Sequence, residues 1–248
     1  MTPVYFETKP ALHLAPYISA YWVSKGFYSD RVMFPVFADG CCDIIYDHSD
    51  FTAKMVGTGA ELTYVPLHGF VDIAGIRFRP GGFTALTGIP AGAIADGTSI
   101  SDILENGLAE EISNRFQSRD HKGFDRIFSG LMNSLNPMIA FWLSGVSIGI
   151  GDMSGYFKCS EKTVNRAFLT HTGVSPVRMI AVKRFRHALG LVLDGKKSMT
   201  EIAYDSEYCD QSHFIKDFRK FTGVRPSDFL RYKDSLGVRF IQFPSGCM

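Results

Sequence analysis

The stretch Cys209–Pro226, CDQSHFIKDFRKFTGVRP, decides the fold of the second half of the chain, and two interpretations compete for it. Cys209 and His213 are four residues apart, a spacing that offers two metal ligands. Alternatively, Asp210 caps a helix that ends at Gly223, because aspartate accepts from the free N–H groups of a first turn and glycine adopts the left-handed conformation after a last turn. Two ligands do not fill a four-coordinate metal site, which favours the capped helix.

A second copy of this stretch lies 50 residues earlier, at Cys159–Pro176, CSEKTVNRAFLTHTGVSP. Ser160 takes the place of the capping residue, and Val164 takes the place of an apolar Phe. Thr163 stands where His213 stands, so the cap and the core repeat but the Cys/His pair does not. Six further identities are Cys, Phe, Thr, Gly, Val and Pro at 159/209, 168/218, 172/222, 173/223, 174/224 and 176/226.

Each copy follows a short amphipathic segment, IGIGDMSGYF at 148–157 and MTEIAYDSEY at 199–208. Two short helices joined by a tight turn form a helix-turn-helix, so we predict two such modules. The segment between them, 176–197, is predicted to be one long helix, because its apolar residues follow helical spacing. These residues are Met179, Val182, Phe185, Ala188, Leu189 and Val192.

The outward face of the second helix in each module carries polar side chains of the kinds that contact DNA bases. Phe214 and Phe218 are four apart and must face the core, which turns their polar neighbours outward near the helix N-terminus. An ordinary solvated face is the alternative, and the doubled module favours DNA. The predicted base-reading residues are Lys162, Asn165, Arg166, Gln211, Ser212, His213 and Lys216. The predicted phosphate contacts are Ser160, Arg178, Lys183, Arg219, Lys220 and Arg225.

The distribution of charge agrees with a nucleic-acid partner for the second half. Of the 248 residues, 46% are hydrophobic and 21% charged, which is typical of a globular protein with a sizeable core. Residues 1–136 contain 10 Lys and Arg against 15 Asp and Glu, a net charge of −5. Residues 137–248 contain 16 against 10, a net charge of +6, so the whole-chain charge of +1 hides an acidic front and a basic back.

Cysteine usage and the N-terminus both favour a reducing cytoplasm. The five Cys form no CxxC pair, which argues against a zinc cage or a disulfide framework. The N-terminal residues lack the basic start and apolar run of a signal peptide. The stretch 127–151 is free of charge and has about the length of a membrane span, but Asn136–Pro137 breaks it, so we predict a domain junction there.

The front half reads as β-rich. RVMFPVFADG, CCDIIYDHSD, FTAKMVGTGA and VDIAGIRFRPGG are short runs of Val, Ile and Phe between Gly, Asp and Pro turn signals. After Gly82 the pattern becomes helical, with one helix through SISDILENGLAEEISNRF, capped by Ser101 or Asp102, and a second through HKGFDRIFSGLMNSLN. We predict a sensing or dimerisation domain at 1–98, connector helices at 99–136, a DNA-binding domain at 137–232 and a tail at 233–248, expected to form an added strand.

The C-terminal sequence resembles the AraC/XylS family of bacterial transcription regulators. The resemblance covers the whole domain and is most specific in EIAYDSEYCDQSHFIKDFRKFTGVRPSDFLRY, Glu201–Tyr232. Three residues depart from the family pattern. Glu207 stands where the family has Gly in the turn, Tyr208 replaces Phe, and Lys216 replaces Arg, which keeps the charge but loses the two-pronged guanidinium.

FADGCCDIIYD and GIRFRPGGFTALTGIP resemble the N-terminal domain of a subgroup of these regulators. That resemblance implies a small cupin-like barrel with an effector-sensing or dimerising role. Trp22, Arg77 and Arg79 are the candidate effector-pocket residues, with core packing or ion pairing as the alternative. Three histidines lack the His-x-His spacing of a cupin metal site, so we predict no metal and no cofactor. They are His13, His48 and His68.

Together these features predict an α+β multidomain protein with an N-terminal cupin-like barrel, connector helices and a C-terminal all-α domain with two helix-turn-helix modules. The expected function is sequence-specific regulation of transcription in the bacterial cytoplasm, through double-stranded DNA bound in two successive major-groove segments roughly 34 Å apart. The expected partners are a small-molecule effector, RNA polymerase and a second copy of the chain. The alternatives are a ligand-independent dimeric DNA-binding protein, and an enzyme, either a cupin-like metalloenzyme or a cysteine-dependent repair protein, fused to the DNA-binding domain; we predict no enzymatic activity.

Overall fold

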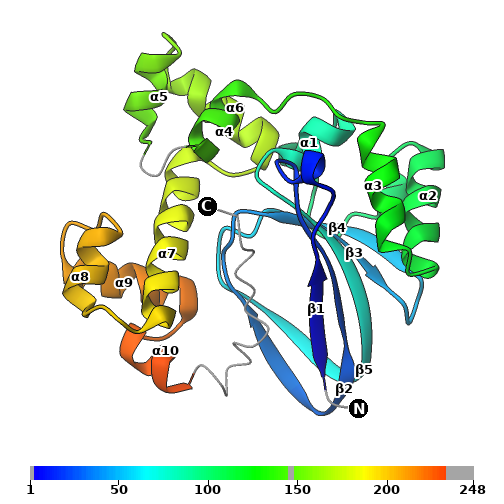
Figure 1. Ribbon diagram of the computed structural model, residues 1–248, viewed down its shortest axis with the longest axis horizontal. Coiled ribbons are helices and arrows are strands. Elements are labelled where there is room, and N and C mark those ends of the chain that lie inside the picture. The colour runs from blue at the N-terminus through cyan, green and yellow to red at the C-terminus, as the bar shows by residue number, and fades with distance from the viewer. Residues whose placement is uncertain (1–2, 145–147, 233–248) are drawn as a thin grey trace.

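A β-rich N-terminal half is followed by an all-helical C-terminal half (Figure 1). The computed structural model describes residues 3–144 and 148–232. This order of elements confirms the predicted α+β fold class with two helix-turn-helix modules. The strand expected in the tail 233–248 lies outside the described residues.

Five strands form one antiparallel sheet in the order β1-β2-β5-β3-β4, with β1 and β4 at its edges. β2 and β5 are 19 and 16 residues long and pair along most of their length. Register shifts at Ile18/Ala20 and Tyr28/Val32 interrupt that pairing, and such bulges increase the local twist. The strands are β1 Val4–Thr8, β2 Ile18–Val36, β3 Cys42–Asp47, β4 Thr52–Val56 and β5 Thr63–Phe78.

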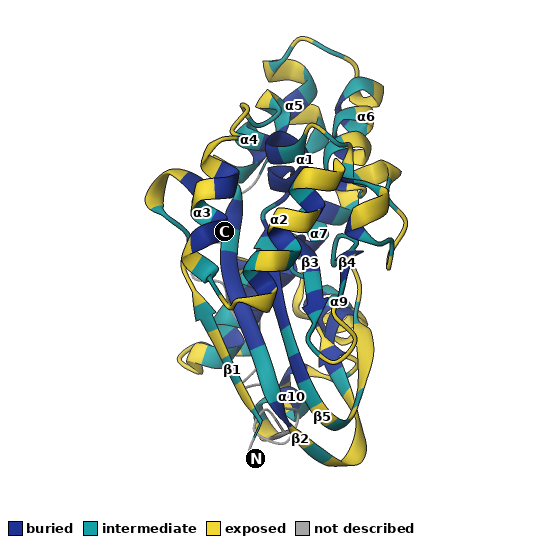
Figure 2. Ribbon diagram, turned by 90° about the vertical axis from the view of Figure 1, so that its right-hand side faces the viewer, coloured by how far each residue is buried: buried dark blue, intermediate teal, exposed yellow. Residues whose placement is uncertain are grey.

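One face of the sheet packs against two helices, α2 (Asn106–Gln117) and α3 (His121–Ser129), and encloses the first hydrophobic core. Tyr46 of β3 stacks on Phe116 of α2 with ring centroids 5.2 Å apart. Figure 2 shows the buried segments of the strands behind these helices, whose outer turns are exposed. The two predicted connector helices therefore share a core with the sheet. Shorter elements are α1 Gly82–Thr87 and the 3-10 turns η1 Leu12–Leu14, η2 Ala91–Ala93 and η3 Ile100–Asp102.

The boundaries of α2 and α3 differ from the prediction. Ile100–Asp102 forms a 3-10 turn, so α2 begins only at Asn106. The predicted helix from His121 onward ends before Gly130, a residue that disfavours helix continuation. After it, the Asn133 side chain donates to the Leu131 carbonyl, 3.2 Å away, and gives that carbonyl a partner outside a helix.

The charge-free stretch 127–151 is divided among three helices, α3, α4 (Pro137–Ser144) and α5 (Ile150–Tyr156). Asn136 accepts from the Met138 N–H at 3.0 Å, and this bond begins α4 at the predicted Asn-Pro break. In residues 3–144 and 148–232 we find no helix with both the length and the apolarity needed to cross a membrane.

Two helix-turn-helix modules lie at opposite ends of α7 (Pro176–Asp194), as Figure 1 shows. Val164 and Phe168 anchor the core of the first module, and Phe185, Phe214 and Phe218 anchor that of the second. The first module contains α5 and α6 Glu161–Thr172; the second contains α8 Met199–Asp205 and α9 Gln211–Thr222, followed by α10 Pro226–Tyr232.

The sequence repeat persists at the level of single hydrogen bonds. Ser160 and Asp210 each accept, through the side chain, from the N–H three residues later. At the other end of each helix a threonine hydroxyl donates to the carbonyl four residues before it, Thr172 to Phe168 at 2.7 Å in α6, and the equivalent pair at 2.8 Å in α9. Gly173 and its equivalent then adopt φ angles of 76° and 80° as predicted for helix stops.

The turns between the two helices of each module differ by one residue. Lys158 has φ 49° in the first module and Glu207 has φ 59° in the second, both in the left-handed region. Lys158 lies two residues before its cap and Glu207 three residues before its cap, so the second turn is one residue longer. Glu207 therefore occupies the conformation for which the family uses Gly, and the chain forms the turn despite the steric cost of Cβ.

We expect Glu207→Gly to raise the free energy of unfolding by about 1 kcal/mol, because glycine adopts a positive φ without the Cβ clash. Such a gain corresponds to a Tm higher by about 2–4 °C in a chain of this size. Glu207→Ala is the matched control, since it removes the carboxylate but keeps Cβ. Thermal unfolding of both variants checks the expectation. An equal rise in Tm for both would mean that loss of the Glu207 carboxylate, and not relief of the positive φ, causes the effect.

Candidate DNA interface and ligand cavity

The second helix of each module turns one face to the core and the other outward. Val164 and Phe168 of α6, like Phe214 and Phe218 of α9, are fully buried. The side chains predicted to read bases lie on the remaining faces. Exposed are Lys162, Arg166, Gln211, Ser212 and Lys216, and half-buried are Asn165 and His213. The structure thus brings each group to the surface of one helix, at its N-terminal half.

Two of these side chains are held by their own module. The His213 ring packs edge-on against Tyr208, with centroids 5.1 Å apart. The Gln211 side-chain oxygen accepts from the Thr200 hydroxyl of α8 at 3.0 Å. These contacts fix the orientation of the His213 and Gln211 side chains in the free protein. Less conformational entropy is then lost when the two side chains bind a partner.

Four of the six predicted phosphate contacts are exposed, namely Ser160, Arg219, Lys220 and Arg225. The prediction does not fit Arg178, whose guanidinium lies 2.8 Å from the Glu61 carboxylate and donates to the Ala60 carbonyl at 2.9 Å. It also does not fit Lys183, which donates to the Trp142 carbonyl at 2.8 Å and whose pKa is lowered by burial. Both cations have partners within the protein, because the loop after β4 lies against Arg178 and α4 lies against Lys183.

The Cys209/His213 pair lies at the surface without further ligands. Cys209 is exposed and precedes the capping Asp210. Among the described residues no group of three or more His, Cys, Asp or Glu side chains could hold a metal ion. The stretch Cys209–Pro226 forms the predicted capped helix.

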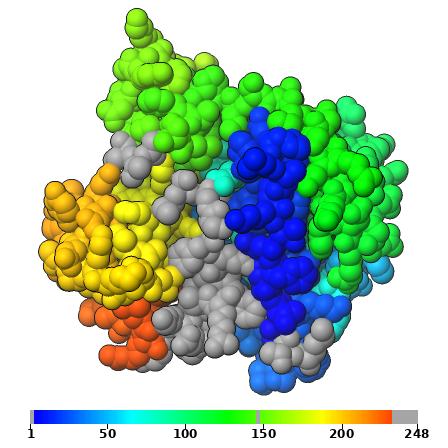
Figure 3. All heavy atoms as spheres, viewed as in Figure 1, coloured from blue at the N-terminus to red at the C-terminus, as the bar shows by residue number. Residues whose placement is uncertain are grey.

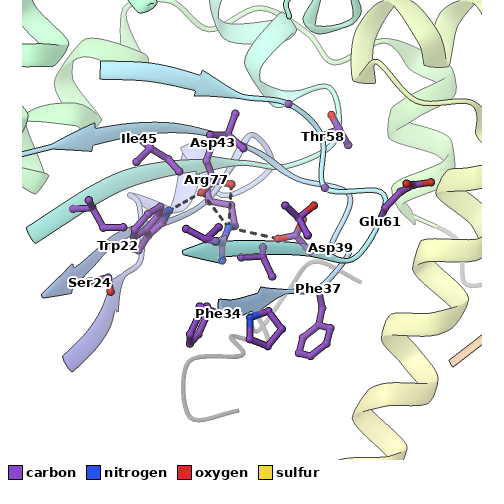
Figure 4. A pocket seen from close by; sticks show the side chains of 18 of the residues that line it. Trp22, Ser24, Phe34, Phe37, Asp39, Asp43, Ile45, Thr58, Glu61 and Arg77 are labelled. Atoms are coloured by element: carbon purple, nitrogen blue, oxygen red, sulfur yellow. Dashed lines mark hydrogen bonds and ion pairs between the residues drawn. The ribbon is translucent and has the colours of Figure 1, made fainter. Parts of the chain in front are cut away.

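A cavity of about 620 Å³ lies between the sheet and helix α7, and Figure 4 shows it from close by. Its volume is in the range of small-molecule sites, roughly 300–1,000 Å³. Loop 57–61, which joins β4 to β5, forms one wall, and Arg186 is the contribution of α7. The aromatic lining consists of Tyr5, Trp22, Tyr28, Phe34 and Phe37.

One buried guanidinium faces three carboxylates at this cavity. Arg77 lies 3.3 Å from Glu7, 3.6 Å from Asp39 and 3.3 Å from Asp43 (Figure 4 draws the last two pairs). Trp22 donates its indole N–H to Asp43 at 2.6 Å. Burial raises the pKa of Glu7 and of Asp43, and the positive charge of Arg77 opposes the rise. The single guanidinium therefore lies within ion-pair distance of three carboxylates at once.

Two of the three predicted effector-pocket residues, Trp22 and Arg77, line this cavity, and Arg79 does not. Alternation along a strand places residues 77 and 79 on one face. However, β5 ends at Phe78, and the Arg79 N–H donates to the Tyr17 carbonyl at 2.8 Å in the following turn. Arg79 therefore lies outside this cavity because the strand stops one residue too early.

The sequence interpretation missed Arg186, the one residue of α7 in the cavity wall. Arg186 is only 7% exposed, although it is charged. It lies four residues after Val182 and three before Leu189, so it interrupts the apolar stripe of α7. A charged residue within the apolar stripe of α7 could have indicated a functional site from the sequence. Only the fold shows that this part of α7 lies beside the sheet.

The N-terminal half contacts both helix-turn-helix modules. Toward the first module, Thr58 donates its hydroxyl to the Thr172 carbonyl at the end of α6, and Thr84 donates to the neighbouring His171 carbonyl at 3.1 Å. Toward the second, Phe37 packs edge-on against Phe229 of α10 with centroids 5.8 Å apart. In the space-filling view the helices of both modules form one side of the molecule, along the N-terminal half (Figure 3).

We expect Gly92→Ala to destabilise this contact by about 1–3 kcal/mol, the usual range for overpacking. A Cβ at Gly92 in η2 would collide with the backbone carbonyl of Leu169 in α6, and backbone cannot rotate away. Amide hydrogen exchange of α6 and residues 91–93, with thermal unfolding, measures the effect. Gly107→Ala in α2 is the control, because no atom lies within 4 Å of its added Cβ. Unchanged exchange in Gly92→Ala would contradict the close approach.

Sequence comparison places both halves among known domains. A helix-turn-helix domain profile matches residues 153–232, and a domain of unknown function matches residues 6–100. The HTH-type transcriptional regulator YidL of Escherichia coli (strain K12) is 33% identical over 85 residues, 34% of this chain and 29% of that protein. The HTH-type transcriptional activator RhaS of Salmonella newport (strain SL254) is 32% identical over 80 residues, 32% of this chain and 29% of that protein.

The chain thus aligns with less than a third of the length of these curated relatives. Among solved structures, ToxT from Vibrio cholerae gives a TM-score of 0.42 at 12% identity, covering 93% of this chain and 97% of that one. The DNA-binding domain of AdpA, solved in complex with a target DNA, gives 0.35 at 20% identity, covering 42% and 94%. The C-terminal half therefore contains a helix-turn-helix domain and is similar to the corresponding part of these HTH-type transcriptional regulators.

Proposed function

We propose that this protein is a sequence-specific DNA-binding transcription regulator whose N-terminal half binds a small-molecule effector. The observation that carries the DNA-binding part is the pair of matching capped helices, α6 and α9, with outward polar faces at the two ends of α7. A recognition helix contacts base edges with its N-terminal residues, where both predicted groups lie.

The length of α7 supports binding to two successive segments of the major groove. A 19-residue helix spans about 28 Å, which is close to one turn of B-DNA, about 34 Å. Two modules at the ends of such a helix are spaced to meet one face of a duplex. The exposed Arg219, Lys220 and Arg225 in and after α9 are suited to hold phosphates beside the bases.

The cavity between the sheet and α7 supports the effector part of the proposal. Loop 57–61 lines this cavity and also bonds to the DNA-binding half through Thr58, Ala60 and Glu61. A ligand that shifts this loop would change how α6 and α7 are held. We further infer a homodimer and a contact with RNA polymerase, both of which the family resemblance implies.

The test is selection of the preferred duplex from random DNA with the purified full-length chain, followed by affinity measurements against that duplex and a scrambled one. We expect a preference of about a thousandfold or more for the selected duplex. The logarithm of the affinity should fall linearly with the logarithm of salt concentration, because bound phosphates release counterions. Equal affinity for both duplexes would overturn the proposal, and salt-dependent binding without preference would indicate a sequence-independent DNA-binding protein.

A further inference from the structure

We propose that the cavity between the sheet and α7 binds a small organic cation with a flat aromatic body. This assignment rests on the proposed function, because it identifies that ligand as the effector. Three features carry it: the excess of carboxylates over guanidinium groups, the aromatic walls, and the loop that belongs to both the cavity and the domain contact.

The charges at the cavity favour a positive ligand. Asp39, Asp43 and Asp96 line it, against the guanidinium groups of Arg77 and Arg186. Glu61 also lines it but pairs with a cation of the DNA-binding half, and Glu7 bonds to Arg77 from just behind the wall. Among the described residues, Asp39, Asp43, Asp96 and Glu7 then give four carboxylates against two guanidinium groups. A positively charged ligand would balance this excess of negative charge, which is unfavourable in a site that excludes part of its water.

An anionic ligand would compete with buried carboxylates for Arg77. Arg77 already lies within 3.6 Å of Glu7, Asp39 and Asp43, so an anion would have to displace a buried carboxylate from it. Burial raises the pKa of Glu7 and of Asp43, and the negative charge of Asp39 raises both further. A second negative charge would increase that repulsion, and a cation would relieve it.

The aromatic lining suits a flat ring that carries the charge. Tyr5 and Trp22 stack with centroids 5.8 Å apart and form one rigid wall. Figure 4 shows Phe34 and Phe37 on another side of the space into which Asp39 and Arg77 project. An aromatic cation gains ring stacking and cation–π attraction at such walls, about 0.5–2 kcal/mol for the latter. The volume of about 620 Å³ accommodates a tricyclic body.

Loop 57–61 connects this ligand to the DNA-binding half. Thr58 lines the cavity while its hydroxyl bonds to the end of α6 at Thr172. Ala60 and Glu61 line it while both bond to Arg178 at the start of α7. Arg186 from α7 completes the wall. A ligand in the cavity would therefore act on the end of α6 and the start of α7, which gives a direct route from ligand to recognition helix.

The test uses three probes with the same tricyclic outline and different charge. They are N-methylacridinium as the cation, acridine at a pH where it is uncharged, and anthracene-9-carboxylate as the anion. Calorimetry with the full-length chain is expected to show the cation binding at least about tenfold more tightly than the uncharged probe, and the anion more weakly than either. Equal binding of all three, or tightest binding of the anion, would overturn the proposal.

Variants then locate the binding site. Asp39→Asn keeps an acceptor for the Cys41 N–H and removes one charge, so it should weaken the cation several-fold and leave the uncharged probe unchanged. Asp102→Asn, on the exposed turn η3, is the control. An equal effect of both variants would place the cation elsewhere. Because the three-probe comparison uses the unmodified chain, the proposal stays testable even if the variant fails to fold.

DNA affinity measured with and without the cation separates this inference from the proposed function. A several-fold change in affinity for the selected duplex supports the cation as effector. Selective DNA binding without any cation binding overturns the ligand assignment and leaves the regulator intact. Cation binding without selective DNA binding keeps the site but overturns its role as an effector site.

Discussion

The double variant Asn165→Ala with Gln211→Ala is expected to lose roughly 2–6 kcal/mol of binding to the selected duplex, about thirtyfold or more in Kd. One side chain lies on α6 and the other on α9, so each module loses one amide of the kind that reads adenine. The two losses should add, because the two side chains belong to separate modules. Binding to scrambled DNA should change little, since it depends on phosphate contacts.

Fluorescence anisotropy with both duplexes measures this difference. Asn114→Ala with Gln117→Ala is the matched control, because it makes the same two changes on the exposed face of α2, far from either module in the chain. The control should leave both affinities unchanged. If the double variant lost affinity for the selected and the scrambled duplex to the same extent, Asn165 and Gln211 would contact the DNA backbone and not the bases.

Arg77→Leu is expected to lower the free energy of unfolding by about 3–5 kcal/mol at neutral pH. The substitution leaves the Glu7, Asp39 and Asp43 carboxylates buried without the guanidinium that they share. Arg77→Lys is the informative comparison, since it keeps the positive charge and loses only the planar, multiply bonded head. Denaturant unfolding of the three proteins should give the order Arg, then Lys, then Leu.

The loss in Arg77→Leu should depend on pH with a defined sign. Arg77 lowers the pKa of Glu7 and of Asp43 against the effect of burial, so its removal raises both further. A carboxyl whose folded pKa exceeds its unfolded pKa, about 4, favours folding most below the unfolded value and loses that contribution as pH rises through the folded value. The stability difference between variant and native protein should therefore shrink as pH falls toward about 4. A difference that is constant with pH would contradict the charge argument.

Much of the C-terminal half could be predicted because its information is local. The cap at Asp210, the core Phe214 and Phe218, and the stop at Gly223 lie within one helix, where spacing alone fixes which side faces inward. The copy 50 residues earlier then confirmed the same hydrogen bonds at the same positions. Even the unusual turn was visible, because Glu207 stands where glycine was expected and adopts a positive φ.

The predicted partners of charged side chains were less accurate, because the spacing of a charged residue in the sequence does not indicate which group it pairs with. Arg178 and Lys183 were predicted as phosphate contacts on a basic helix. In the structure Arg178 pairs with Glu61, and Lys183 donates to the Trp142 carbonyl. Arg79 shared the strand alternation of Arg77 but lies beyond the last paired residue of the strand.

The sequence by itself determined the two capped helix-turn-helix modules, the long helix between them and the outward polar faces of α6 and α9. Short-range hydrogen bonds and the 3.6-residue period specify these features within about a dozen residues. Only the tertiary structure decided the cavity, because its wall joins Trp22, Asp43, Arg77 and Arg186 from four distant segments. Such groups meet only when the sheet and α7 pack together, and burial in that contact is what makes their charges interact strongly.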